Sequence, residues 1–172
     1  RRSIKSYKEL PQLLYHIQWK FRDELRPRFG VMRGREFLMK DAYSFDLNLE
    51  SSESSYNKFF VCYLKTFERM GLKAIPMAAD TGPIGGDMSH EFVIISNTGE
   101  SDIYFDKNIL DQGEKISDIN YEDNLSTFVQ NFKNYYSASD EKFDQKEFDQ
   151  NVNKDFQMTS KGIEVGHIFS FG

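Results

Sequence analysis

The chain has 172 residues, with 22 Lys and Arg against 27 Asp and Glu, so its formal net charge is −5 at pH 7. This length suits one domain that buries roughly 70% of the surface of its unfolded chain, and an apolar content of 39% with 16 Phe and 9 Tyr excludes disorder over the whole chain. No apolar run approaches the ~20 residues of a membrane helix, and the single cysteine, Cys62, excludes an internal disulfide or a cysteine-built zinc site. We therefore expect a soluble, cytoplasmic protein with no membrane partner.

The charge is distributed unevenly along the chain. Residues 1–40 hold eleven Lys and Arg against four Asp and Glu (+7), whereas residues 97–158 hold six against fourteen (−8). A basic block of this kind attracts nucleotides or nucleic acids, or it simply forms a solvated surface. The charge alone does not distinguish these two alternatives.

The first predicted strand covers about residues 13–22. Its apolar residues alternate with polar ones, which is typical of a half-buried strand with an aromatic-rich face. These apolar residues are Leu13, Tyr15, Ile17, Trp19 and Phe21. A basic, turn-rich loop follows, and a second strand is predicted to return over about residues 36–45.

This hairpin combines the residue types that a nucleotide needs. Arginine supplies forked donors for phosphate, a carboxylate accepts from an exocyclic amine, and phenylalanine offers a face for stacking. The pattern alone indicates contact with a nucleotide or RNA. As an alternative, Arg22 and Glu24 could form a salt bridge within the strand.

Beyond the hairpin, the sequence predicts one long helix and several further strands. Between Ser51 and Gly71, apolar residues recur at helical spacing, which predicts a helix over 51–70 that faces the core with Tyr56, Phe60, Tyr63, Phe67 and Met70. Strands are predicted near 74–79, 90–96, 103–105 and 162–170. The acidic, Asn-rich segment 97–158 is predicted to be an insertion or satellite region, outside the core, that holds one or two small helices.

Three segments carry a specific resemblance to one family. Residues 21–45 contain Phe-Arg-Asp-Glu-Leu-Arg-Pro-Arg-Phe-Gly, residues 79–92 end in Ser-His-Glu-Phe, and residues 161–169 read Lys-Gly-Ile-Glu-Val-Gly-His-Ile-Phe. In this order they resemble motif 2, a Gly-rich segment and the strand ahead of motif 3 in bacterial-type prolyl-tRNA synthetases, which are class II aminoacyl-tRNA synthetases. The resemblance covers about residues 1–105 and 159–172.

The resemblance implies an α+β fold with a curved antiparallel β-sheet flanked by helices, here as an incomplete catalytic core. Residues 1–96 would be the catalytic core, with the motif 2 hairpin at about 13–46. Residues 97–158 would be an acidic, truncated insertion in place of an editing domain. Residues 159–172 would return to the core and lead to motif 3, which the sequence does not contain. A segment this short and acidic is not expected to bind and edit tRNA.

The resemblance also implies roles for individual residues. Arg22 would be the catalytic residue, because it would bridge the proline carboxylate and the α-phosphate of ATP. The ATP-binding residues would be Arg22, Glu24 on the adenine amino group, Arg33, Phe37 as the stacking ring, and Glu164 on the ribose. The proline-binding residues would be Arg22, His90, Glu91, Gly166, His167 and Phe169. Taken alone, His90 and His167 would more often be buried structural histidines, and only their motif setting favours a binding role. No metal ligand is expected.

The activity that the resemblance implies is ATP-dependent activation of proline to prolyl-adenylate, followed by transfer to tRNA(Pro). Mg2+ would bind with the ATP phosphates, and the full-length enzyme would be a homodimer. The isolated chain is expected to be inactive. The alternative is a non-catalytic synthetase-like paralogue that acts as a regulatory or tRNA-binding module. The joint presence of Arg22, Glu24, Phe37 and Glu164 argues against that alternative.

Overall fold

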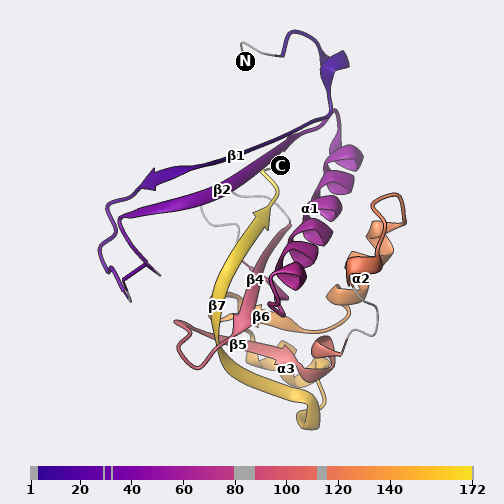
Figure 1. Cartoon of the computed structure of the whole chain (residues 1–172). Coiled ribbons are helices and arrows are strands. Elements are labelled where there is room, and N and C mark those ends of the chain that lie inside the picture. Colours follow the sequence, from indigo (N-terminus) through magenta and orange to yellow (C-terminus); the bar gives the residue numbers. More distant parts are fainter. Residues whose placement is uncertain (1–3, 29, 32, 80–87, 112–115, 172) are drawn as a thin grey trace. The chain divides into compact units, whose positions relative to one another are not determined.

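The structure, a computed structural model, describes residues 4–28, 30–31, 33–79, 88–111 and 116–171. The chain forms two compact units, Arg1–Ser52 and Glu53–Gly172, and each is described by itself. The first unit holds a short 3-10 helix (Tyr7–Glu9), β1 (Gln12–Phe21) and β2 (Glu36–Phe45) (Figure 1). Of the helices in the described ranges, none is long and apolar enough to cross a membrane.

Strands β1 and β2 form a two-stranded antiparallel ribbon. The pairing runs from Gln12 opposite Phe45 to Phe21 opposite Glu36, so both predicted strands of the hairpin are confirmed. The apolar face of β1 is exposed, with Tyr15 at 72% and Trp19 at 61% exposed. The prediction of a half-buried strand is therefore wrong, because within the described part of this unit the ribbon has no second layer to cover that face.

Helix α1 (Leu49–Arg69) links the ribbon to the second unit, and its ends are set by identifiable residues. The side chain of Asn48 accepts from the backbone N–H of Ser51 at 2.9 Å, which caps the first turn. At the other end, Gly71 has a φ of +74°, and Leu72 N–H donates to the carbonyl of Phe67 at 2.9 Å. This is the Schellman arrangement, in which glycine takes the left-handed position.

The predicted core face of α1 is largely confirmed. Tyr56, Phe60 and Phe67 are buried, and Tyr63 packs against the same core. The prediction fails for Met70, which is 65% exposed because the helix ends one residue before it.

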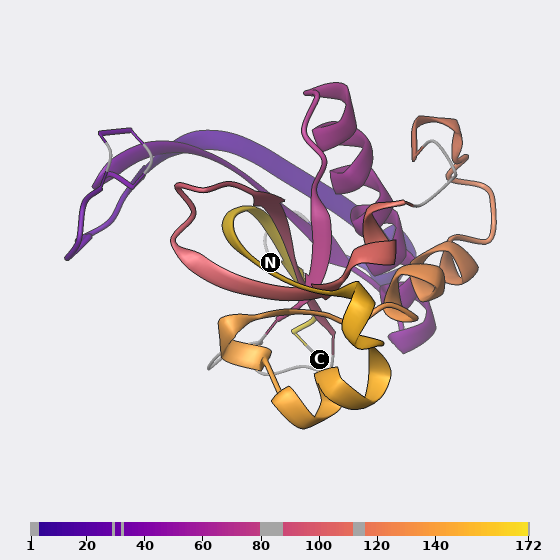
Figure 2. The same cartoon turned by 90° about the horizontal axis from the view of Figure 1, so that it is seen from below.

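The second unit is built around a closed five-stranded barrel. Its strands are β3 (Ile75–Ala78), β4 (Ser89–Ile95), β5 (Ser101–Asp106), β6 (Ser137–Ser139) and β7 (Gln157–Phe169), in the spatial order β3-β4-β7-β5-β6. All neighbours are antiparallel except β3 and β6. The α+β class with antiparallel pairing is thus confirmed. The long curve of β7 is visible in Figures 1 and 2.

Segment 97–158 contributes directly to this core. It supplies β5 and β6, the helices α2 (Leu125–Lys133) and α3 (Gln145–Asn151), and four 3-10 turns, Lys107–Leu110, Ile116–Asp118, Asp140–Lys142 and Lys154–Phe156. Ile103 and Phe105 are fully buried, and Phe132 of α2 packs against Phe60 of α1 with ring centroids 5.7 Å apart. The prediction that this segment lies outside the core is therefore wrong, because its alternating apolar residues complete the barrel.

Candidate active site

Four of the predicted nucleotide-binding residues lie together at the loop end of the ribbon. The backbone N–H of Arg22 donates to the carbonyl of Arg35 at 2.9 Å, which continues the strand pairing one residue beyond β1. The Arg22 guanidinium lies over the ring of Phe37, with its carbon 5.2 Å from the ring centroid. This cation–π contact joins the predicted phosphate-binding and base-stacking residues.

Glu24 is held in place by three arginines of the same loop. Its carboxylate accepts from the backbone N–H of Arg26 at 3.0 Å and lies 3.5 Å from Arg33 Nη1. Its carbonyl accepts from Arg35 Nε at 3.0 Å. The hydrogen bond from Arg26 and the charge of Arg33 hold the pKa of Glu24 below its usual range. The carboxylate therefore stays ionised and pairs with Arg33, whereas the Arg22 guanidinium lies over Phe37.

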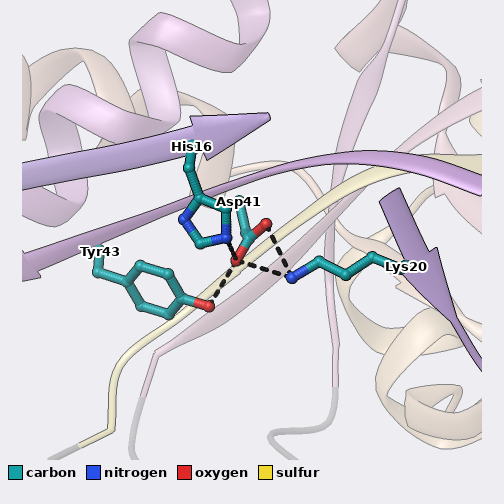
Figure 3. A network of polar contacts seen from close by, with 4 residues as sticks. All are labelled: His16, Lys20, Asp41 and Tyr43. Carbon is teal, nitrogen blue, oxygen red and sulfur yellow. Dashed lines mark hydrogen bonds and ion pairs between the residues drawn. The ribbon is translucent and has the colours of Figure 1, made fainter. Parts of the chain in front are cut away.

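A second polar cluster lies on the same face of the ribbon, nearer to its other end (Figure 3). Asp41 is its centre, since His16 Nε2, Lys20 Nζ and the Tyr43 hydroxyl all lie within 3.3 Å of Asp41 Oδ2. The hydrogen bond that Tyr43 donates at 2.7 Å, together with Lys20 and His16, lowers the pKa of Asp41. We name these four residues the Asp41 cluster.

The predicted residues of the second unit gather where β4 and β7 pair. Glu91 lies directly opposite His167, and the next polar residue along β7, Glu164, lies opposite Val93. His167 Nδ1 is 3.8 Å from Glu164 Oε1, and the His167 ring makes an edge contact with Phe169 at 5.1 Å. The structure therefore brings Glu91, Glu164, His167 and Phe169 to one face.

A β-bulge explains why Glu164 and His167 share this face. Residues three apart in a regular strand point to opposite sides, because the side-chain period is two. Between the pairs Phe92–Gly166 and Val93–Glu164, β7 has one extra residue, Val165. Because of this extra residue, the side chains of Glu164 and His167 both lie on the same face of the sheet as Glu91.

Ser89 fixes the ring of His167. Its hydroxyl lies 2.7 Å from His167 Nε2, which leaves Nδ1 toward Glu164. Burial lowers the pKa of His167, so the imidazole is largely uncharged at neutral pH. A neutral imidazole held at one nitrogen presents a defined donor or acceptor at the other.

The other two predicted proline-binding residues face helix α1. His90 is half-buried, its Nδ1 lies 2.6 Å from the Tyr56 hydroxyl, and desolvation lowers its pKa to about 4. A β-carbon added to Gly166 would lie 3.1 Å from Phe67 and 3.3 Å from Tyr63, so glycine permits the close approach of α1. The described contacts of these two residues are thus packing contacts, and their assignment to the proline pocket stays a prediction.

Three ligand atoms from Glu91, Glu164 and His167 lie within 4.8 Å of one another. Mg2+ prefers oxygen ligands in octahedral geometry, and an imidazole nitrogen does not suit it. This donor set therefore does not fit Mg2+, and the expected absence of a protein metal ligand stays a prediction. The predicted Gly-rich segment lies mostly at residues 80–87, outside the described residues.

Glu91 is expected to titrate near neutral pH. Burial, with the neighbouring carboxylates of Glu164 and Glu141, raises its pKa to about 7. Because protonation is favoured in the folded state, the contribution of Glu91 to stability is largest below about pH 4.5 and falls as the pH rises toward 7. We expect that fall to be about 1–2 kcal/mol, since partial exposure screens the interaction.

The pKa of Glu91 can be measured by a carboxyl 13C NMR titration. Glu164→Gln removes one neighbouring negative charge and should move the midpoint downward, while burial keeps it above the ordinary value. A titration midpoint near 4.5 for Glu91 in the unsubstituted protein would contradict the prediction that its pKa is raised.

Comparison with known proteins shows the family of this chain. The model of the tRNA synthetase class II core domain (G, H, P, S and T) matches residues 1–172. The chain therefore belongs to the class II tRNA synthetase core-domain family, and the family resemblance of the sequence is confirmed.

Individual relatives make the similarity more specific. A proline–tRNA ligase of Pelagibacter ubique (strain HTCC1062) is 60% identical over 172 residues, which is all of this chain and 38% of that protein. Proline–tRNA ligases of Parvibaculum lavamentivorans and Bradyrhizobium diazoefficiens are 59% and 56% identical, again over all of this chain and 39% of each protein. The chain thus spans about two fifths of the length of the curated relatives it matches.

Sequence reasoning missed the residues that support the predicted ones. Ser89 contacts His167, Tyr56 contacts His90, and Asp41 on the ribbon contacts the side chains of three other residues. The available signal was the alternation of β1 and β2. It places Lys20 on the polar face of β1 and Asp41 on the same face of β2 as Phe37, but only the register of the hairpin shows that Lys20 and Asp41 share a face.

Proposed function

We propose that the protein that carries this chain activates proline with ATP to form prolyl-adenylate and then transfers proline to tRNA(Pro). The observation that carries the proposal is the grouping of Arg22, Glu24, Arg33 and Phe37 at one end of the ribbon. Family membership and the names of the relatives support the same activity. A homodimer, and Mg2+ carried by the ATP phosphates, are parts of this proposal.

In the first step, a carboxylate oxygen of proline attacks the α-phosphorus of ATP, and pyrophosphate leaves from the opposite side. Arg22 bridges the two negatively charged reactants, and its forked donors stabilise the charge that develops on the α-phosphate. Glu24 accepts from the adenine amino group, and Phe37 stacks on the base. In the second step, a terminal ribose hydroxyl of the tRNA attacks the acyl carbon, and AMP leaves.

This chemistry needs positioning and charge neutralisation, and it needs no covalent intermediate on the protein. The guanidinium carbon of Arg22 lies 5.2 Å from the centroid of the Phe37 ring. Binding of adenine at Phe37 would replace this contact and release the guanidinium toward the phosphate. Glu91, His167 and Phe169 are proposed to contact proline, and Glu164 the ribose.

Segment 97–158 has a structural role in this proposal. Its strands complete the barrel that carries β4 and β7, and its net charge of −8 opposes a nucleic-acid backbone. We infer that the segment does not edit mischarged tRNA.

The deciding experiment is amino-acid-dependent ATP–pyrophosphate exchange on the intact protein. We expect exchange with proline and much weaker exchange with alanine, cysteine and threonine. A folded protein that binds ATP but catalyses no exchange with any of these amino acids would contradict the proposal and favour a non-catalytic paralogue.

A further inference from the structure

The Asp41 cluster holds a lysine in a fixed position on the nucleotide face of the ribbon. Lys20 Nζ lies 3.2 Å from Asp41 Oδ1 and 3.3 Å from Oδ2. Oδ1 is buried and makes no hydrogen bond of good geometry in the described chain, so it depends on the charge of Lys20. Oδ2 is shared with Tyr43 and His16. Both oxygens of this carboxylate thus lie close to the ammonium (Figure 3).

The register places this lysine on the same face as the proposed ATP-binding residues. Lys20 lies directly opposite Phe37, and Arg22 follows two residues later on the same face. Asp41 lies four residues beyond Phe37, which corresponds to about 13 Å along the strand. The side chain of Lys20 runs toward Asp41, so its ammonium lies away from the stacking ring, along the ribbon.

A bound nucleotide would bring negative charge to this region. If adenine stacks on Phe37, the phosphates and the joined amino acid lie several ångström from the ring. An ammonium has three N–H donors, and one of them donates to Asp41 Oδ2. The side chain of Lys20 is 24% exposed, so the lysine is not sealed inside the ribbon and can take a further oxygen partner.

We propose that Lys20 is a second cationic binding residue, which contacts an oxyanion of the substrates beside Arg22, and that Asp41 is the residue that positions it. This inference rests on the proposed function. The oxyanion is either a phosphate of ATP or the carboxylate of proline. A cation fixed before binding loses little side-chain entropy when the ligand arrives, which is the benefit of the Asp41 cluster.

The first test compares two lysines of equal charge. Lys20→Gln keeps an N–H donor for Asp41 but removes the positive charge, whereas Lys40→Gln removes a charge from the opposite face of β2. In the intact protein, Lys20→Gln should raise one KM in the exchange reaction by about 10–100-fold with a much smaller change in kcat. A rise in the KM for ATP identifies phosphate, and a rise in the KM for proline identifies the carboxylate. Lys40→Gln should leave both constants unchanged.

The second test separates positioning from simple stabilisation of the ribbon. The exchanged pair Lys20→Asp with Asp41→Lys restores an ion pair but moves the cation to the other strand. Stability should recover in this double variant, while the raised KM should persist. Asp41→Asn should raise the same KM as Lys20→Gln does. Lys20→Arg keeps the positive charge, so its KM should stay close to that of the unsubstituted protein.

Several results would overturn the inference. One is proline-dependent exchange in which Lys20→Gln behaves like Lys40→Gln. Another is full recovery of KM in the exchanged pair, because the ion pair would then act only on the ribbon structure. Direct ATP and proline titrations give the same comparison without turnover. If the intact protein neither binds ATP and proline nor catalyses exchange, this result would contradict both the proposed function and this inference.

Discussion

Replacement of Arg22 by alanine is expected to lower the rate of proline-dependent ATP–pyrophosphate exchange by about 10²–10³-fold in the intact protein. The reason is that the guanidinium would neutralise charge that grows on the α-phosphate as the carboxylate attacks. The fold should survive, because Arg22 joins the ribbon through its backbone N–H and its side chain is exposed. Exchange kinetics and circular dichroism together check both expectations.

Two variants sharpen this test. Arg26→Ala removes an exposed guanidinium from the same loop but keeps the backbone N–H that donates to Glu24, so its exchange rate should stay close to normal. Arg22→Lys keeps the charge without the fork and should recover only part of the activity. Unchanged exchange in Arg22→Ala would remove the catalytic assignment.

Replacement of Gly162 by alanine is expected to destabilise the barrel by about 3 kcal/mol. A β-carbon at this position would lie 2.3 Å from Val93 Cγ1 and 3.1 Å from Ile103 Cγ2. Both neighbours are buried, at 2% and 0% exposure, so neither can move aside freely. The measurement is hydrogen exchange by mass spectrometry on peptides that cover β4, β5 and β7.

Val93→Ala supplies the matched control for this substitution. It removes the atom that the new methyl group would strike, so the double variant should be more stable than the sum of the two single changes predicts. Strict additivity would show that the crowding at Gly162 is relieved elsewhere.

The periodic segments were predictable because local sequence determines them. Alternation predicted β1, and helical spacing predicted α1 with most of its core face. Arg22, Glu24, Arg33 and Phe37 could be selected because they lie within one contiguous motif, and a hairpin necessarily brings such residues together.

The features that escaped prediction depend on pairing between distant segments. The bulge at Val165 is visible only once β4 and β7 are in register, and without it Glu164 and His167 would be assigned to opposite faces. Strand β6 has three residues and no periodic signal, although it closes the barrel. The acidic composition of 97–158 concealed apolar positions that only the barrel explains.

The position of β7 in the barrel also governs the order in which the second unit can form. Strand β4 pairs with β7, and Ser89 lies opposite Phe169, so these two paired residues are about two thirds of the unit apart in sequence. Strand β5 also pairs with β7. Closing such a long loop precedes any gain from the contacts, which slows folding. During synthesis, β7 is the last described strand to leave the ribosome, and until then β4 and β5 expose the edges that it will cover.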